Sequence, residues 1–231
     1  MITHLNEIGI TNQMITSLFI TILLGILAFL ATRNMKMIPS GLQNFAEWAV
    51  ETMQNFFAGV MGERLIKKYL PFIATFFIYI MFCNYSGLLP LCGKIPGFSA
   101  PTSTINFPAG MAIVAFLGIQ VVAIREHRSF IKAYRDLLFR PVAIIFPLMF
   151  IEMFVKPLSL TLRLYGNVFG DETVTHELTT LFPLIAPVVM QLLGTLMGLV
   201  QALVFALLCA TYWTEAAECE EDEKLLHADL S

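Results

Sequence analysis

Charged residues are scarce in this chain of 231 residues: they make up 13% of it, whereas hydrophobic residues make up 57%. Soluble domains carry roughly a quarter charged residues, so the composition excludes an ordinary soluble domain. Uncharged runs longer than the ~20 residues needed to cross a hydrocarbon core indicate a polytopic membrane protein instead. These runs are 8–32, 69–93, 95–124 and 178–214.

Other features are also missing. The N-terminus has no basic region, so no cleavable signal is expected. The 4 cysteines lack metal-ligand spacing, and we expect neither a metal site nor a cofactor. Cys83 and Cys92 either pair on an oxidising side of the membrane or stay as free thiols. No internal repeat is visible, which argues against transporters built from inverted repeats.

Basic residues set the expected topology, because Lys and Arg accumulate on the cytoplasmic side. Arg33 and Lys36 follow the first uncharged run, and Arg125 and Arg128 follow the third, whereas Lys94 is the only basic residue in a predicted external loop. The N-terminus is therefore expected outside and the C-terminus inside. We expect spans at 14–31, 69–89 and 107–124, a long helix at 141–182, a last helix at 187–216 and a cytoplasmic acidic tail at 217–231.

Residues 39–63 have a different pattern. Apolar side chains recur every three or four residues, from Leu42 and Phe45 to Val60, and polar ones such as Glu47 occupy the other side. An amphipathic helix of this kind beside a span is expected to lie along the membrane interface. The fold class predicted for the whole chain is therefore all-α, with about five transmembrane helices plus one interfacial helix. The last two helices form a long, tilted hairpin.

The predicted helix 141–182 places charges inside the membrane, where each costs ~2.5–3.5 kcal/mol on insertion scales. At 100° per residue, polar or small side chains fall within about 40° of Arg163 and form one stripe. Glu172 lies about 180° away, with His176 one turn further on. The members of the stripe are Glu152, Lys156, Ser159, Asn167 and Gly170.

Arg163 is a permanent cation, because a guanidinium does not lose its proton in a protein. Such a group attracts a carboxylate and repels a passing cation, but it does not relay protons. Glu152 lies about three turns, or ~16 Å, along the helix, too far for a direct pair. Glu172 faces the other way. An acidic group on another subunit fits Arg163 best.

The last helix carries Gly194, Gly198 and Gln201 on one face. The two glycines predict close helix packing rather than a channel role. We expect the amide of Gln201 to hydrogen-bond a neighbouring side chain, with Arg163 as the expected partner. Tyr212 and Trp213 are expected at the cytoplasmic interface as part of an aromatic belt.

These motifs resemble the a subunit of the F-type ATP synthase membrane sector. The resemblance is carried by Lys-Pro-Leu-Ser-Leu-Thr-Leu-Arg-Leu-Tyr-Gly-Asn at 156–167 with Glu172, and by Gln-Ala-Leu-Val-Phe at 201–205 with Tyr212. Asn-Tyr-Ser-Gly-Leu-Leu-Pro at 84–90 and Ala-Pro-Thr-Ser-Thr-Ile-Asn at 100–106 add support. The spacing holds over most of the chain after residue 40.

The resemblance implies a non-catalytic stator subunit with two offset half-channels that pass H⁺ or Na⁺ to and from a c-subunit ring. Arg163 then separates the half-channels, with Asn167 and Gln201 beside it. The resemblance assigns Glu172, together with His176, to the outer route and Glu152 to the inner one. This chain departs from some members at Gly194 and from many at Thr104, where those members carry titratable residues.

The partners implied are the c-ring, b-type peripheral stalk subunits, the rest of the ATP synthase and membrane lipid, with no nucleic acid. The implied location is a bacterial plasma (inner) membrane. The alternatives are a stand-alone transporter or channel that uses Arg163 to bind an anionic substrate, and a purely structural membrane protein. The cost of the buried charges disfavours the structural alternative.

Overall fold

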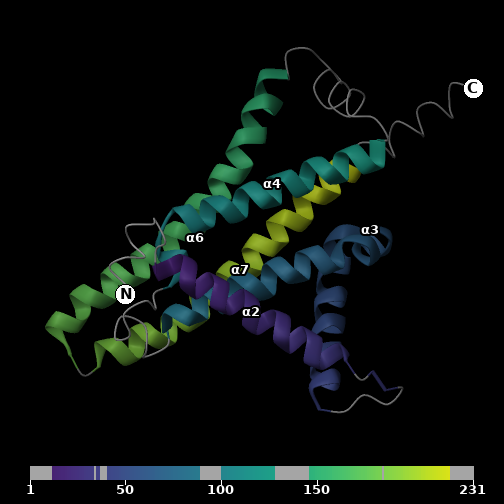
Figure 1. The fold of residues 1–231 in the computed structure, drawn as a ribbon. Helices are drawn as coiled ribbons and strands as arrows, with labels where there is room; N and C mark the ends of the chain where they lie inside the picture. The colour runs from purple at the N-terminus through teal and green to yellow at the C-terminus, as the bar shows by residue number, and fades with distance from the viewer. Residues whose placement is uncertain are drawn as a thin grey trace, which may run out of the picture.

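A computed structural model describes residues 12–33, 35–36, 41–88, 100–127, 146–183 and 185–218, with the side chains at 88, 122–127, 146–153, 172 and 216–218 left out. This part of the chain is helical, apart from short connections. The elements are α2 (Asn12–Thr32), α3 (Leu42–Leu88), the 3-10 turn η1 (Pro101–Ser103), α4 (Asn106–His127), α6 (Phe146–Leu181) and α7 (Ala186–Glu218). Figure 1 shows their arrangement.

The protein is an all-α polytopic membrane protein, as the composition predicts. Helices α2, α3 and α7 are long and apolar enough to cross a membrane, and α4 contributes a shorter apolar stretch over Asn106–Val121. Helix α6 differs because it carries Lys156, Arg163 and Asp171 along its length. The predicted acidic tail beyond 218, the segment 128–145 and the loop 89–99 lie outside the described residues.

The amphipathic segment and the second span meet in α3. Gly62, with φ 72° and ψ 161°, interrupts the helix between them. A positive φ is readily adopted by glycine but strained for other residues, so this position directs the chain away from the interfacial segment. Before the kink, Phe45 and Trp48 are 64% and 61% exposed, whereas Phe57 is buried. The segment thus presents large apolar side chains to its surroundings.

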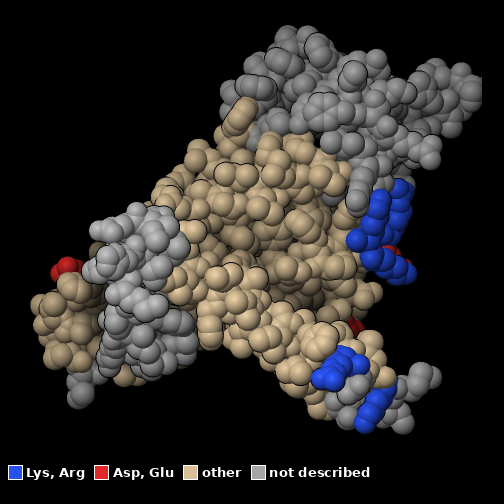
Figure 2. Space-filling model, in the orientation of Figure 1, with Lys and Arg blue, Asp and Glu red and all other residues tan. Residues whose placement is uncertain are grey.

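Exposed Lys and Arg side chains form two small groups on the face shown in Figure 2, and the rest of the described surface there is almost uncharged. One group, Arg33 and Lys36, follows the end of α2. The other, Arg64, Lys67 and Lys68, follows the kink of α3. We expect both groups at the cytoplasmic ends of the first two spans.

Helices α6 and α7 form a long hairpin (Figure 1). Helix α6 has 36 residues and would be ~54 Å long if straight. Pro157 lies inside it, and a proline breaks the backbone ladder and allows a bend. Helix α7 begins at Ala186, with Pro187 in its first turn, where a missing N–H costs nothing.

Helix α7 is the centre of the packing, because it contacts α3, α4 and α6. Trp213 lies in a buried cluster with Tyr69, Ile73 and Ala210 from α3 and α7. Phe205 lies in a second cluster that joins α3, α4, α6 and α7. The outward faces of α2, α6 and α7 expose many large apolar side chains. Such faces suit contact with lipid or with other membrane subunits.

Two glycines allow the helices to approach closely. A Cβ on Gly198 would lie 3.2 Å from the Cβ of Asn84, and the Asn84 amide donates a hydrogen bond of 3.0 Å to the Gly198 carbonyl. A Cβ on Gly118 would lie 2.8 Å from Cζ2 of Trp213 and 3.3 Å from Cε1 of Phe72. The indole of Trp213 therefore occupies the space that Gly118 leaves open.

Replacing Gly118 by alanine is expected to destabilise the protein by roughly 1–3 kcal/mol, because the new methyl group overpacks the Trp213 site. Gly110→Ala in the same helix is the matched control, since a Cβ there meets nothing within 4 Å. Thermal unfolding of the purified chain in detergent measures both variants. Equal melting temperatures for the two would contradict the packing described for Trp213.

Candidate functional site

Arg163 lies on the exposed side of α6, at the edge of the face that packs inward. Leu160 and Leu164, its neighbours by one turn and by one residue, are fully buried at 2% and 0% exposure. The side chain of Arg163 itself is exposed and has no hydrogen bond or ion pair within the described part of the chain. Helix α6 thus presents a permanent cation outward.

Asn167 and Gln201 join the two arms of the hairpin. The Asn167 side-chain amide donates a hydrogen bond of 2.6 Å to Oε1 of Gln201, which is only 4% exposed. The expectation that Gln201 bonds to Arg163 is therefore wrong. The reason is geometric: Asn167 lies about one turn beyond Arg163, on the side of α6 that meets α7, whereas Arg163 is on the exposed side.

A small cavity of about 60 Å³ lies beside this hydrogen bond. Helices α3, α6 and α7 and the residue Ala100, just before η1, form its walls. Its polar lining residues are Asn84, Asn167, Asp171 and Gln201. Gly194 and Gly198 line it as well and leave the space that side chains would fill. A single water needs roughly 10–15 Å³ of such volume, so the cavity is large enough for a few waters.

Two of the three side-chain amides that line the cavity keep unused hydrogen-bonding capacity. Asn84 Oδ1 and Gln201 Nε2 are buried and have no hydrogen-bond partner among the described residues, although the other atom of each amide is bonded. One is an acceptor and the other a donor. Buried polar atoms of this kind are normally satisfied by protein or by water. The site can therefore hold water next to the carboxyl group of Asp171.

The structure does not bring all predicted site residues together. The side chain of His176, on α6, is 79% exposed, and its Nδ1 lies 3.6 Å from Oε1 of Glu177. His176 does not line the cavity. Glu152 and Glu172 belong to α6, but their side chains lie outside the described set. Arg163, Asn167 and Gln201 are placed along the α6–α7 hairpin.

Sequence reasoning missed two residues of the site. Asp171 had a signal: it follows Asn167 by about one turn, on the same side of the helix, but the motif directed attention to Glu172. Asn84 lies on α3, far away in the sequence, and no spacing rule relates it to α6 or α7. Only the folded structure places its amide against Gly198 and the cavity.

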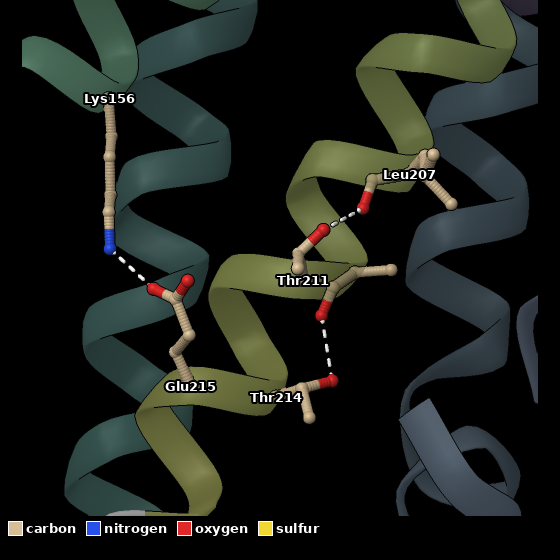
Figure 3. Close-up of polar contacts among 6 residues, drawn as sticks. Lys156, Leu207, Thr211, Thr214 and Glu215 are labelled. Carbon is tan, nitrogen blue, oxygen red and sulfur yellow. Dashed lines mark hydrogen bonds and ion pairs between the residues drawn. The ribbon is translucent and has the colours of Figure 1, made fainter. Parts of the chain in front are cut away.

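A second polar contact joins α6 and α7 near the end of α7. Lys156 Nζ lies 2.5 Å from Oε2 of Glu215 and 4.7 Å from the ring centroid of Tyr212. Figure 3 shows the lysine reaching across from α6 to the carboxylate on α7. The same view shows Thr211 and Thr214 bonded to carbonyls of their own helix, at Leu207 and Ala210. Those hydroxyls are thus already engaged within α7.

The fold and the site together define a membrane protein with a fixed cation at the surface of a long polar helix. The family model described as ATP synthase A chain matches residues 14–214. The chain belongs to this family.

Its relatives include ATP synthase subunit a 1 of Pelobacter propionicus, 40% identical over 176 residues that cover 74% of this chain and 72% of the relative. ATP synthase subunit a of Moorella thermoacetica is 39% identical over 186 residues, or 78% of each chain. That of Trichlorobacter lovleyi is 38% identical over 176 residues, or 74% of this chain and 71% of the relative.

The Asn167–Gln201 hydrogen bond is expected to couple the two helices energetically. In a double-mutant cycle of Asn167→Ala and Gln201→Ala, we expect an interaction energy of about 0.5–2 kcal/mol, the range for polar pairs between membrane helices. Unfolding by SDS in mixed micelles measures it. As a control, Thr195→Ala combined with Asn167→Ala should be additive, because Thr195 bonds to Gln191 of its own helix. An additive Asn167–Gln201 cycle would contradict the coupling.

Proposed function

We propose that the chain is the stator subunit of a rotary ATP synthase, with two offset half-channels that carry H⁺ or Na⁺ to and from a ring of c subunits. Arg163 separates the half-channels. The observation that carries the proposal is the position of this arginine: exposed on a membrane helix, with no ion-pair partner in the described part of the chain. Family membership supplies the setting.

The physical basis is the cost of charge in hydrocarbon. A carboxylate on a ring subunit is expensive to ionise while it faces lipid, so it stays loaded with its ion there. Beside Arg163 the ionised form is stabilised, and the ion leaves. Because the guanidinium keeps its charge, it also repels ions that would pass directly between the half-channels. An ion therefore crosses only by riding on the ring.

The outer route is assigned to the cavity beside Asn167 and Gln201. Asp171 supplies a carboxyl group there, and Asn84 and Gln201 offer a free acceptor and a free donor for water. Glu172 remains assigned to this route from the sequence resemblance. His176 is assigned to this route from the sequence alone, because its side chain is exposed and does not line the cavity.

The inner route is assigned to the other end of α6, where Glu152 precedes Lys156. The subunit performs no catalysis and needs no cofactor in this role. It is proposed to work with the c-ring, b-type peripheral stalk subunits and the rest of the synthase in a bacterial plasma membrane. Its N-terminus lies outside and its C-terminus in the cytoplasm, as the positions of Lys and Arg favour.

Arg163→Ala is expected to abolish ion-coupled ATP synthesis in the assembled complex, because a ring carboxylate then has no fixed counter-charge at which to release its ion. Membrane vesicles assayed for ATP synthesis under an imposed ion gradient measure this. The control is Arg33→Ala, which removes an exposed cation after α2 and should leave the rate unchanged. A normal rate of ATP synthesis in the Arg163→Ala complex would exclude the proposed role of Arg163 in separating the half-channels.

Asp171→Asn is expected to slow coupled transport by about tenfold, equivalent to ~1.4 kcal/mol of barrier, because the outer cavity loses its titratable group. The volume of the side chain hardly changes, so packing is preserved. ATP-driven ion pumping, normalised to the amount of assembled complex, measures the effect. An unchanged rate would exclude Asp171 from the route, whatever the result for Arg163.

A further inference from the structure

The contact between Lys156 and Glu215 places a carboxylate on the seam between α6 and α7. Along α6 this contact lies before Arg163, whereas the cavity lies beyond it. Lys156 precedes Arg163 by about two turns of α6, whereas Asn167 and Asp171 follow Arg163. Glu215 lies near the end of α7. The seam therefore carries an acidic group on each side of the permanent cation.

Tyr212 lies beside this ion pair. Its ring centroid is 4.7 Å from Lys156 Nζ. Lys156, Tyr212 and Glu215 thus form a group of polar side chains between α6 and α7.

The solvent exposure of the Glu215 side chain favours a role for this residue beyond holding α7 against α6. Its side chain is 53% exposed, whereas that of Lys156 is 23% exposed. Lys156 is covered between the carboxylate and the tyrosine ring, which holds the ammonium in place as a counter-charge. Glu215 lies against that charge and still presents its carboxylate to the surroundings. A group of this kind can accept a proton and release it to water.

We infer that Glu215 is the exit carboxylate of the inner route and that Lys156 positions it. This inference rests on the proposed function. When the ion is H⁺, the proton leaves a ring carboxyl group beside Arg163, reaches the Glu215 carboxylate through water and passes from there to cytoplasmic water. Lys156 stays protonated throughout, and no other group changes its charge. The ring carboxylate is left ionised against Arg163.

The test replaces Glu215 by neutral and acidic residues in the assembled synthase and measures passive H⁺ conduction and ATP-driven pumping per assembled complex. Glu215→Gln should lower both by about tenfold, and Glu215→Asp should retain most of the rate. Glu51→Gln is the control, because Glu51 is an exposed carboxylate in the amphipathic part of α3. A Glu215→Gln rate equal to that of the control would overturn the inference.

Alkylation of a cysteine at position 215, carried out after the complex has assembled, distinguishes an exit role of Glu215 from a purely structural role in holding α6 against α7. Glu215→Cys complexes are alkylated with iodoacetate, which restores a carboxylate, or with iodoacetamide, which adds a neutral group of nearly equal size. Cys83 and Cys209 are buried, and the unsubstituted complex treated alike serves as the control. The inference expects recovery of conduction with iodoacetate alone. Equal results with both reagents would overturn it.

Arg163→Ala, assayed alongside, separates this inference from the proposed function. If Arg163→Ala abolishes coupled synthesis while Glu215→Gln has no effect, only the exit role of Glu215 fails. If Arg163→Ala retains coupled synthesis, the proposed function fails and the inference fails with it. If Glu215→Gln does not assemble, the alkylated Glu215→Cys complexes decide the result, because their charge is set after folding.

Discussion

A guanidinium in a membrane keeps its charge, and the rest of this structure depends on that constraint. Burying Arg163 in the chain would require a carboxylate from the same chain next to it. The described part of α6 and its neighbours instead turn the arginine outward, while Leu160 and Leu164 bury the adjacent side of the helix. Among the described residues, Arg163 is thus left without an ion-pair partner. The helix is stable as a scaffold because its apolar face is well packed.

The α6–α7 hairpin is what holds that outward position. Polar contacts cross it on both sides of Arg163: the Asn167–Gln201 hydrogen bond on one side and the Lys156–Glu215 pair on the other. Asn84 then ties α7 to α3 through the carbonyl of Gly198. These contacts fix the register of the helices, so the cavity and the seam stay in constant relation to the arginine. The two proposed paths, which end on opposite sides of Arg163, need this rigidity.

Much of the fold could be predicted from the sequence, because membrane insertion imposes simple rules on composition. Long uncharged runs predict spans, and a proline-rich break predicts the turn between α6 and α7, which falls between Leu181 and Ala186. Periodicity also placed Arg163 and Asn167 on one face of the same helix. These features depend on residues close in the sequence.

Contacts between helices could not be predicted in the same way. Gln201 was expected to bond to Arg163 but bonds to Asn167, because helical angles alone do not say which side of α6 meets α7. Asn84 and Glu215 contact α7 and α6 from positions far away in the sequence, so no spacing rule indicated them. Glu172 drew attention from its motif, although the cavity is lined by its neighbour Asp171. Packing, rather than propensity, decides these details.

The most direct measurement of the central claim is a structure of this chain within its complete membrane complex, at a resolution that shows side chains. The account predicts that the nearest carboxylate to the Arg163 guanidinium belongs to another subunit, at ion-pair or water-bridged distance. A direct ion pair between Arg163 and a carboxylate of this same chain would contradict it.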